Sequence, residues 1–505
     1  MSYLVRIVQL GLTLVITPMV LQTAGMTQYG IWAVILQVLA YLGLLEMGMR
    51  VSLERRVAFE IGGGNESNYE ILISTALFFY LIVGVVFLLL GGSISLGLPR
   101  WLNLEKGVAL LAVLVALLAV FGGALNYPVQ ALIGFVRGTQ GMPFIESIEL
   151  FATITTGLVT ILLLNLGVGL LSLPLALLPA VILRWLLAYW KVKKNSNILL
   201  STRIYDKNIL LELLSFSKWV LIGRLSFIVL FNSDNLFVGY WFQPEKIAIY
   251  SLTFLLANNL MGWLLLIGYN LEPGIASVDG RGDHSELVKL YLSFEKIIFS
   301  LGAIAAVLVF FLNRAFIELW IGIENFGGRN LNIIFSLVLI YGAFRQSNAS
   351  FFYAIGKPNL LAKWGVIEAG LKIGLILLLV KPTGLEGIAL STVIAGFVIS
   401  STFILPTVIS TLRISWRLLL GNLILRPILS ICMPMLFLLI FTSSFPNWSW
   451  KSLLLAFLLA MFLFMVGFAF FIVDRDWMSA FILRVCKALF FKTDSFRNNS
   501  DVTNK

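Results

Sequence analysis

Among the charged residues inside the long apolar stretches of this sequence are Arg224 and Asp234 in the run 219–242 and Arg345 in the run 333–355. A charged residue at the centre of a membrane-spanning helix costs about 2.5–3.5 kcal/mol on insertion scales, so it persists where it faces a hydrated cavity or a partner. Neither arginine has an opposite charge within one turn of its own helix. A guanidinium donates planar, bidentate hydrogen bonds to phosphate, so both arginines are candidates for binding an anionic ligand. Asp234 either pairs with an arginine or binds a coupling cation.

Two pairs of opposite charge are spaced four residues apart in other apolar runs, Glu46 with Arg50 and Glu368 with Lys372. Residues at this spacing share one face of a helix, so each pair can partly neutralise itself. The second pair either satisfies itself between helices or lines a cavity, and Arg50 is near enough to the end of its run to extend into the membrane interface. Arg50 and Lys372 are further candidate substrate-binding residues. Glu46 and Glu368 join Asp234 as candidate ion-coupling residues.

The composition indicates a protein that is solvated by lipid. Hydrophobic residues make up 59% of the 505 residues and charged residues 12%, about half the charged fraction of an ordinary soluble chain; the mean hydropathy is +0.97. These values exclude a soluble enzyme and a nucleic-acid-binding protein, despite the net charge of +11. Two cysteines and one histidine provide neither a disulfide framework nor a metal site. We expect no metal and no cofactor.

The elements that position these charges are predicted to be membrane-spanning helices, each of which needs about 20 mostly apolar residues. The sequence predicts an all-α polytopic membrane protein with about fourteen spans, at 4–22, 31–53, 71–96, 107–136, 144–165, 168–190, 219–242, 247–271, 292–312, 333–355, 360–380, 385–408, 424–442 and 452–473. Basic residues favour the cytoplasmic loops, and with the N-terminus inside, these loops collect most of them, including Arg55, Arg56, Lys193, Lys194, Arg413 and Arg417. We therefore expect both termini in the cytoplasm.

The two halves of the chain correspond after a shift of 218 residues. Trp32 then falls on Tyr250, Glu54 on Glu272 and Gly138 on Gly356. Spans one to six thus repeat as spans seven to twelve in the same orientation, the parallel repeat of some transporters. The predicted domains are an N-terminal six-helix lobe (1–200), a C-terminal six-helix lobe (201–412), two additional helices (413–473) and a cytoplasmic tail (474–505). Two such lobes would enclose a cavity and open it to alternate sides by rocking.

The loops and the tail limit the function further. No loop is long enough to hold a nucleotide-sugar domain or an extracytoplasmic active site, so a membrane glycosyltransferase, polymerase or ligase is disfavoured and no covalent chemistry is expected. The segment after Val473 alternates apolar and basic residues and predicts an amphipathic helix on the inner leaflet, followed by a polar, disordered end.

Short motifs resemble a known family. The stretch around Pro18, Gly25, Tyr29, Gly30 and Glu46 resembles the start of the polysaccharide transporter (O-antigen, or lipid-linked oligosaccharide, flippase) family, within the superfamily that also holds multidrug exporters and lipid II flippases. The stretch NSDNLFVGYWFQPEKIAIYSLTF resembles the junction of the seventh and eighth spans in that family. The resemblance covers about residues 4–410, and the fourteen spans with cytoplasmic termini also agree with it.

The resemblance implies a flippase that moves a polyprenyl-pyrophosphate-linked oligosaccharide from the inner to the outer leaflet of the bacterial cell membrane. It implies a cationic cavity between two lobes and coupling to H⁺ or Na⁺, with membrane lipid, a glycan polymerase and chain-length proteins as further partners and no nucleic acid. In this interpretation Arg224 and Arg345 hold the pyrophosphate or acidic sugars. A cation-coupled multidrug exporter is the alternative, and it would need a cavity dominated by carboxylates and aromatic residues.

Overall fold

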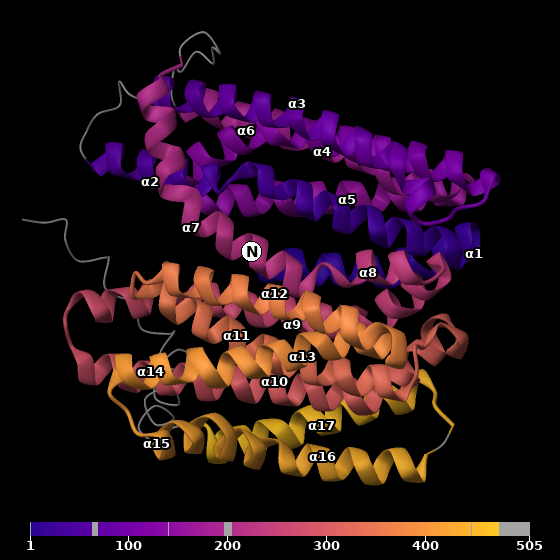
Figure 1. Ribbon diagram of the computed structural model, residues 1–505, viewed down its shortest axis with the longest axis vertical. Coiled ribbons are helices and arrows are strands. Elements are labelled where there is room, and N and C mark those ends of the chain that lie inside the picture. The colour runs from indigo at the N-terminus through magenta and orange to yellow at the C-terminus, as the bar shows by residue number, and fades with distance from the viewer. Residues whose placement is uncertain (1, 63–68, 140, 196–204, 446, 474–505) are drawn as a thin grey trace, which may run out of the picture.

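The first six long helices form one group in space. A computed structural model describes residues 2–62, 69–139, 141–195, 205–445 and 447–473, and these residues form helices and no strand. The predicted tail helix after Val473 lies outside the described residues. The first group (Figure 1, indigo to magenta) comprises α1 (Ser2–Leu42), α2 (Met49–Gly62), α3 (Tyr69–Trp101), α4 (Lys106–Gly138), α5 (Met142–Asn165) and α6 (Ser172–Asn195).

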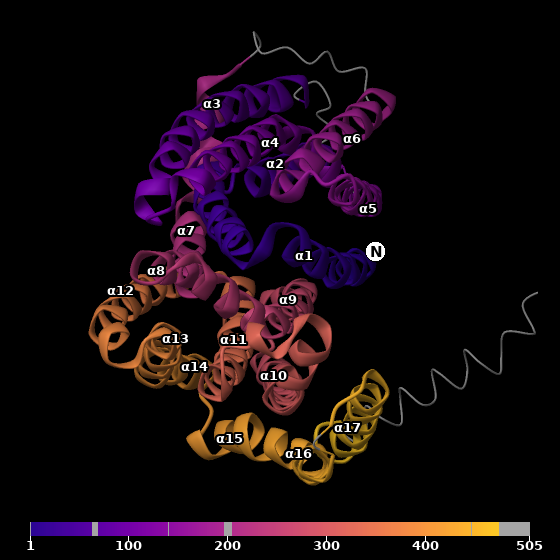
Figure 2. The ribbon, with the colours of Figure 1, turned by 90° about the vertical axis from the view of Figure 1, so that its right-hand side faces the viewer.

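A second group follows, and three further helices lie outside it. Its members are α7 (Lys207–Phe231), α8 (Asp234–Trp241), α9 (Pro244–Gly280), α10 (His284–Ile321), α11 (Arg329–Ala354), α12 (Pro358–Thr383), α13 (Leu385–Ile399) and α14 (Leu405–Leu412). Figures 1 and 2 show α7 crossing from the first group to the second. The outermost helices are α15 (Trp416–Leu420), α16 (Arg426–Ser444) and α17 (Trp450–Phe471), of which α16 and α17 pack against α10.

The helix bounds repeat as the sequence predicts. Adding 218 to the bounds of α3 gives 287–319, against His284–Ile321 for α10; adding it to those of α4 gives 324–356, against Arg329–Ala354 for α11. For α5 the shift gives 360–383, against Pro358–Thr383 for α12. The agreement in length and order supports the internal repeat. The division into lobes at residues 200 and 412 stays a prediction.

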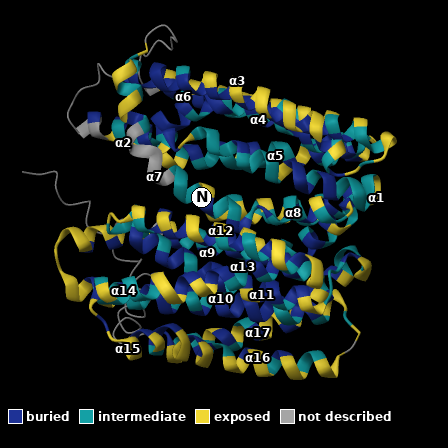
Figure 3. Ribbon diagram, viewed as in Figure 1, coloured by how far each residue is buried: buried dark blue, intermediate teal, exposed yellow. Residues whose placement is uncertain are grey.

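The outward faces of the helices are apolar. Leu89 and Leu96 on α3 are 66% and 67% exposed, and Phe470 on α17 is 79% exposed. Figure 3 shows exposed residues (yellow) along the outer faces of α3 and α16. Large apolar surfaces of this kind are rare on soluble proteins and mark contact with a membrane or a partner. The chain is a multi-pass membrane protein.

Among the described residues, ten helices are long and apolar enough to cross a membrane, or eleven if α7 and α8, bent by 46°, form one span. Two features separate this number from the predicted fourteen. α11 and α12 are full-length helices but do not reach the same apolarity, and they carry Arg345 and the Glu368–Lys372 pair. α1 counts once although it contains the first predicted run and much of the second. The number fourteen therefore stays a prediction.

α1 folds back on itself at Gly25. Gly25 has φ +78°, a conformation that glycine adopts without the strain of a Cβ atom. In a straight helix Gln9 and Gln37 would be about 42 Å apart at 1.5 Å per residue, yet both line a single cavity of about 620 Å³. The two arms therefore lie side by side. The second predicted run is also not continuous, because a 3₁₀ turn at 43–46 leads into Met47 and Gly48, both with positive φ.

The two groups of helices touch where the arms of α1 meet. The Thr27 hydroxyl donates to Glu245 at the start of α9. Gly30 lies so close to the Pro244 carbonyl that a Cβ atom would overlap it. The Trp320 indole N–H donates to the Leu14 carbonyl oxygen at 2.8 Å. These contacts close the end of the molecule that the sequence predicts to face outward.

Candidate functional site

A cavity of about 350 Å³, which we call the arginine cavity, lies between the end of α1 and helices α7, α9, α11 and α12. Arg224 of α7 and Arg345 of α11 both line it. The first group of helices contributes Ala40, Gly43 and Leu44 to the same wall. The structure thus brings together the two arginines that the sequence singled out, at a contact between the two groups of helices.

Arg224 is held loosely by a carboxylate from the first group. Its side chain is 39% exposed, and its Nη1 lies 3.4 Å from Glu46 Oε2. Arg50 Nε lies 3.5 Å from Glu46 Oε1, so the predicted Glu46–Arg50 pair is present and Glu46 bridges two guanidinium groups. Charge-assisted hydrogen bonds are usually about 2.7–2.9 Å long. The longer distances leave donor capacity for another anion.

Arg345 is more deeply placed. Its side chain is 11% exposed, and its Nε lies 3.4 Å from Oε2 of the fully buried Glu368. The Tyr341 hydroxyl donates to the other oxygen of Glu368. The carboxylate partner of Arg345 therefore comes from a neighbouring helix, which residue spacing along α11 cannot reveal.

Lys372 and Asp234 form a second buried ion pair beside this one. Lys372 is fully buried, and its Nζ lies 2.5 Å from Asp234 Oδ1 and donates to the Leu230 carbonyl oxygen at 2.5 Å. The Tyr250 hydroxyl donates to Asp234 Oδ2 at 2.5 Å. Both carboxylate oxygens of Asp234 are therefore occupied by donors. Glu368 and Lys372, which the sequence allowed as a pair of their own, each bind a residue of another helix, and Lys372 lines neither of the cavities described here.

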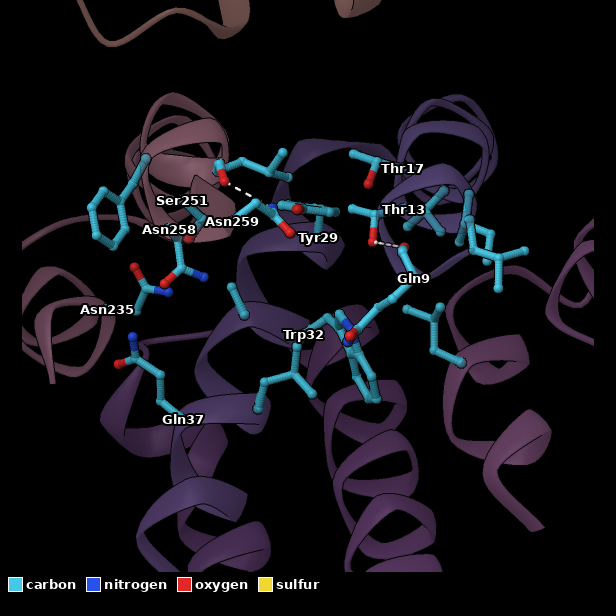
Figure 4. Close-up of a pocket in the computed structure, with 18 of the residues that line it drawn as sticks. Gln9, Thr13, Thr17, Tyr29, Trp32, Gln37, Asn235, Ser251, Asn258 and Asn259 are labelled. Atoms are coloured by element: carbon cyan, nitrogen blue, oxygen red, sulfur yellow. Dashed lines mark hydrogen bonds between the residues drawn. The ribbon is translucent and has the colours of Figure 1, made fainter. Parts of the chain in front are cut away.

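A larger cavity of about 620 Å³ lies between α1, α5 and α6 on one side and α7, α8 and α9 on the other. We call it the amide cavity after six side-chain amides in its lining, Gln9, Gln37, Asn232, Asn235, Asn258 and Asn259; Figure 4 labels all of them except Asn232. Among its described lining residues only Arg184 and Asp234 are charged. Arg184 donates through Nε and Nη2 to Glu149 Oε2, at 3.2 and 3.0 Å. The cavity is therefore close to neutral, unlike the single cationic cavity that the resemblance implied.

The sequence analysis did not find the amide cavity, because it searched for charge. A signal was present: Gln9, Thr13 and Thr17 recur every four residues in the first apolar run, which places three polar side chains on one helix face. Figure 4 shows these three on the first arm of α1 and Trp32 on the second.

The α7 helix and the second arm of α1 each line both cavities. On α7, Arg224 lines the arginine cavity and Phe231 the amide cavity; on α1, Ala40 lines the first and Gln37 the second. Seven residues of helix advance about 10 Å. The two cavities therefore lie near each other along both helices.

Comparison with known proteins identifies the family. Residues 1–278 match the family described as polysaccharide biosynthesis protein. The chain belongs to this family. The match covers more than half of the sequence and confirms the family that the motifs around Pro18 and Asp234 predicted. No curated protein matches the chain.

Solved structures show the same fold at low sequence identity. The inward-facing conformation of a multidrug resistance MATE family transporter of the MOP superfamily matches with a TM-score of 0.67 and 18% identity. The match covers 81% of this protein and 99% of the transporter chain. The outward-facing conformation of such a transporter matches with a TM-score of 0.59 and 17% identity, over 81% and 95%. A MOP superfamily transporter from Pyrococcus furiosus, described as having a binding pocket of reverse polarity, matches with a TM-score of 0.59 and 17% identity, over 82% and 95%. The protein therefore has the MATE-like polytopic fold.

Proposed function

We propose that this protein is a flippase that moves a polyprenyl-pyrophosphate-linked oligosaccharide across the bacterial cytoplasmic membrane for surface polysaccharide biosynthesis, with both termini in the cytoplasm. The observation that carries the proposal is the convergence of Arg224 and Arg345 on one cavity at the contact between the helix groups. Membership of the polysaccharide biosynthesis protein family supports the substrate class. The fold shared with MATE transporters supports transport by alternating access.

The two arginines suit a pyrophosphate. Each guanidinium offers planar donors that match phosphate oxygens, and it keeps its charge in a low-dielectric setting. Their present partners, Glu46 and Glu368, lie 3.4 Å away. A pyrophosphate with shorter contacts would displace them. Substrate and carboxylate thus compete for the same guanidinium groups.

That competition provides a route for ion coupling. We propose that Glu46 and Glu368 bind the coupling ion, H⁺ or Na⁺, when the substrate takes their guanidinium partners. Asp234 has a different place in this scheme, because the tethered ammonium of Lys372 already neutralises it. It would take part only if Lys372 moved away during the transport cycle.

The closed end of the molecule supports an inward-open starting state. The contacts of Thr27 with Glu245 and of Gly30 with Pro244 join the helix groups at the predicted outer side. The TM-score to the inward-facing MATE structure, 0.67, exceeds the 0.59 to the outward-facing one. A flippase that loads its substrate from the inner leaflet would rest in such a state.

A multidrug exporter is the second candidate, because the fold is that of MATE transporters. Cationic drugs would require a cavity with free carboxylates. The carboxylates at the two cavities, Glu46, Glu368 and Asp234, are each paired with a cation. This pairing favours the flippase, and a deletion strain that accumulates a cationic dye would favour the exporter.

Replacing the arginines tests the proposal in cells. Each lost charge-assisted hydrogen bond weakens binding by about 1.5–3 kcal/mol, or about 10- to 100-fold. Arg224→Ala and Arg345→Ala should therefore abolish most surface glycan output at wild-type protein levels. Arg100→Ala, at the end of α3 and away from both cavities, is the matched control. Unchanged output in both cavity variants would refute the proposal.

A further inference from the structure

The amide cavity has the chemistry of a sugar-binding site. Its six amide side chains each present a donor and an acceptor, and a sugar hydroxyl likewise both donates and accepts. Its volume of about 620 Å³ is within the range of about 300–1,000 Å³ typical of small-molecule sites.

Several of these amides have unused hydrogen-bonding capacity. The side chains of Gln9, Asn235 and Asn258 make no hydrogen bond with any described residue, whereas Gln37 accepts from the Leu236 N–H and Asn259 donates to Leu255. Gln9 and Asn258 are exposed and Asn235 is 9% exposed. Their donors and acceptors are therefore open to water or to a polar ligand, and a polyol can satisfy several at once.

Two aromatic rings complete the site. Tyr29 and Trp32 both line the cavity and lie three residues apart on the second arm of α1, which places them on one helix face. In Figure 4 the two rings lie among the polar side chains of the lining. The electron-rich face of an aromatic ring attracts weakly positive C–H groups, and one face of a pyranose ring presents several of them.

The balance of charge in the cavity favours uncharged sugars. Arg184 is held by Glu149, and Asp234 by Lys372 and Tyr250, so none of the described lining residues offers an unpaired cation to a sugar carboxylate. Moving a carboxylate into it would cost desolvation without compensation. The hydroxyl groups of an uncharged sugar can hydrogen-bond to the neutral amides of this cavity without bringing in a charge.

From these observations we propose that the amide cavity binds uncharged sugar residues and discriminates against acidic ones, while the arginine cavity holds the pyrophosphate of the same ligand. This inference rests on the proposed function, and it adds a second subsite and a substrate class. The two cavities share α7 and the second arm of α1. In this proposal a glycan attached to a pyrophosphate in the first cavity reaches the second.

Binding of free trisaccharides to the full-length protein in nanodiscs tests the inference. Uncharged trisaccharides of glucose, galactose and N-acetylglucosamine are compared with trigalacturonate by calorimetric titration. At least one uncharged trisaccharide should bind at least tenfold more tightly than trigalacturonate. Asn258→Ala and Trp32→Ala should each weaken that binding by about three- to tenfold, the effect of about 0.5–1.5 kcal/mol. Gln22→Ala, an exposed amide on α1 outside the cavity, should leave binding unchanged.

Three results would overturn the inference: equal or tighter binding of trigalacturonate, no binding of any uncharged trisaccharide, or binding that neither cavity variant changes. A parallel titration with farnesyl pyrophosphate separates this failure from that of the proposed function. If farnesyl pyrophosphate binding depends on Arg224 and Arg345 while the trisaccharide results are negative, only the sugar subsite is wrong. If replacing Arg224 and Arg345 leaves the affinity for farnesyl pyrophosphate unchanged, the proposed function itself is wrong.

Discussion

The arginine cavity and the amide cavity are lined in part by the same helices, α1, α7 and α9, yet they differ in charge. In the first, Arg224 and Arg345 face the cavity with carboxylates 3.4 Å away. In the second, the charged residues Arg184 and Asp234 are bound at 3.2 Å or less by partners. A charged side chain within this membrane protein therefore indicates a ligand site where the distance to its own ion-pair partner is long enough for a ligand to compete. A tightly paired charge leaves its cavity neutral.

The largest effect is expected from the ion pair that keeps the amide cavity neutral. Lys372→Met leaves Asp234 without its cation, and removing one partner of a buried pair costs about 3–5 kcal/mol. The purified protein should unfold at a clearly lower temperature. Adding Asp234→Asn should restore most of the loss, because it removes the uncompensated charge. A Lys372→Met protein that unfolds at the wild-type temperature would show that the pair does not hold the charge of Asp234.

The next effect concerns the closed end, which decides from which side both cavities are reached. Gly30→Val places a side chain against the Pro244 carbonyl, and overpacking of this kind costs about 1–3 kcal/mol. The population should shift toward a state open at that end, measured as a longer spin-label distance between α1 and α9. Gly11→Val on the same helix, where nothing lies within 4 Å, should leave the distances unchanged. Identical distance distributions in the two variants would contradict this account of the closure.

The smallest effect should sharpen the contrast between loose and tight pairing. Glu46→Gln removes the carboxylate that competes for Arg224, a partly exposed pair of the kind worth about 0.2–1 kcal/mol. Farnesyl pyrophosphate should bind up to about fivefold more tightly. Glu149→Gln, which removes the partner of Arg184, should not change this affinity, since Arg184 lines the other cavity. Weaker binding by Glu46→Gln would mean that Glu46 positions the arginine and does not compete with the ligand.

The sequence predicted much of the fold. Length and apolarity located most helices, and the shift of 218 residues predicted that α3, α4 and α5 recur as α10, α11 and α12. The same patterns missed the fold in α1 at Gly25 and the break at Met47 and Gly48, because single residues with positive φ do not change the hydropathy of a run.

The two arginines that the sequence singled out both line one cavity, and their role in binding stays a prediction. The sequence could not predict their partners. Glu46 and Arg224 are 178 residues apart, and Lys372 and Asp234 are 138 apart, so their pairing depends on how the helices pack. The sequence did not predict the amide cavity, because uncharged amides and threonines are common in membrane helices. Only their convergence from helices of both groups makes Gln9, Asn235 and Asn258 notable.

The central claim is that Arg224 and Arg345 together bind a lipid pyrophosphate. Titration of farnesyl pyrophosphate into the wild-type protein and the Arg224→Ala/Arg345→Ala double variant, both in nanodiscs, tests it most directly. The account predicts that the double variant binds at least about 100-fold more weakly, from the loss of two charge-assisted contacts, while Arg100→Ala binds like the wild type. Equal affinity of the double variant and the wild type would contradict it.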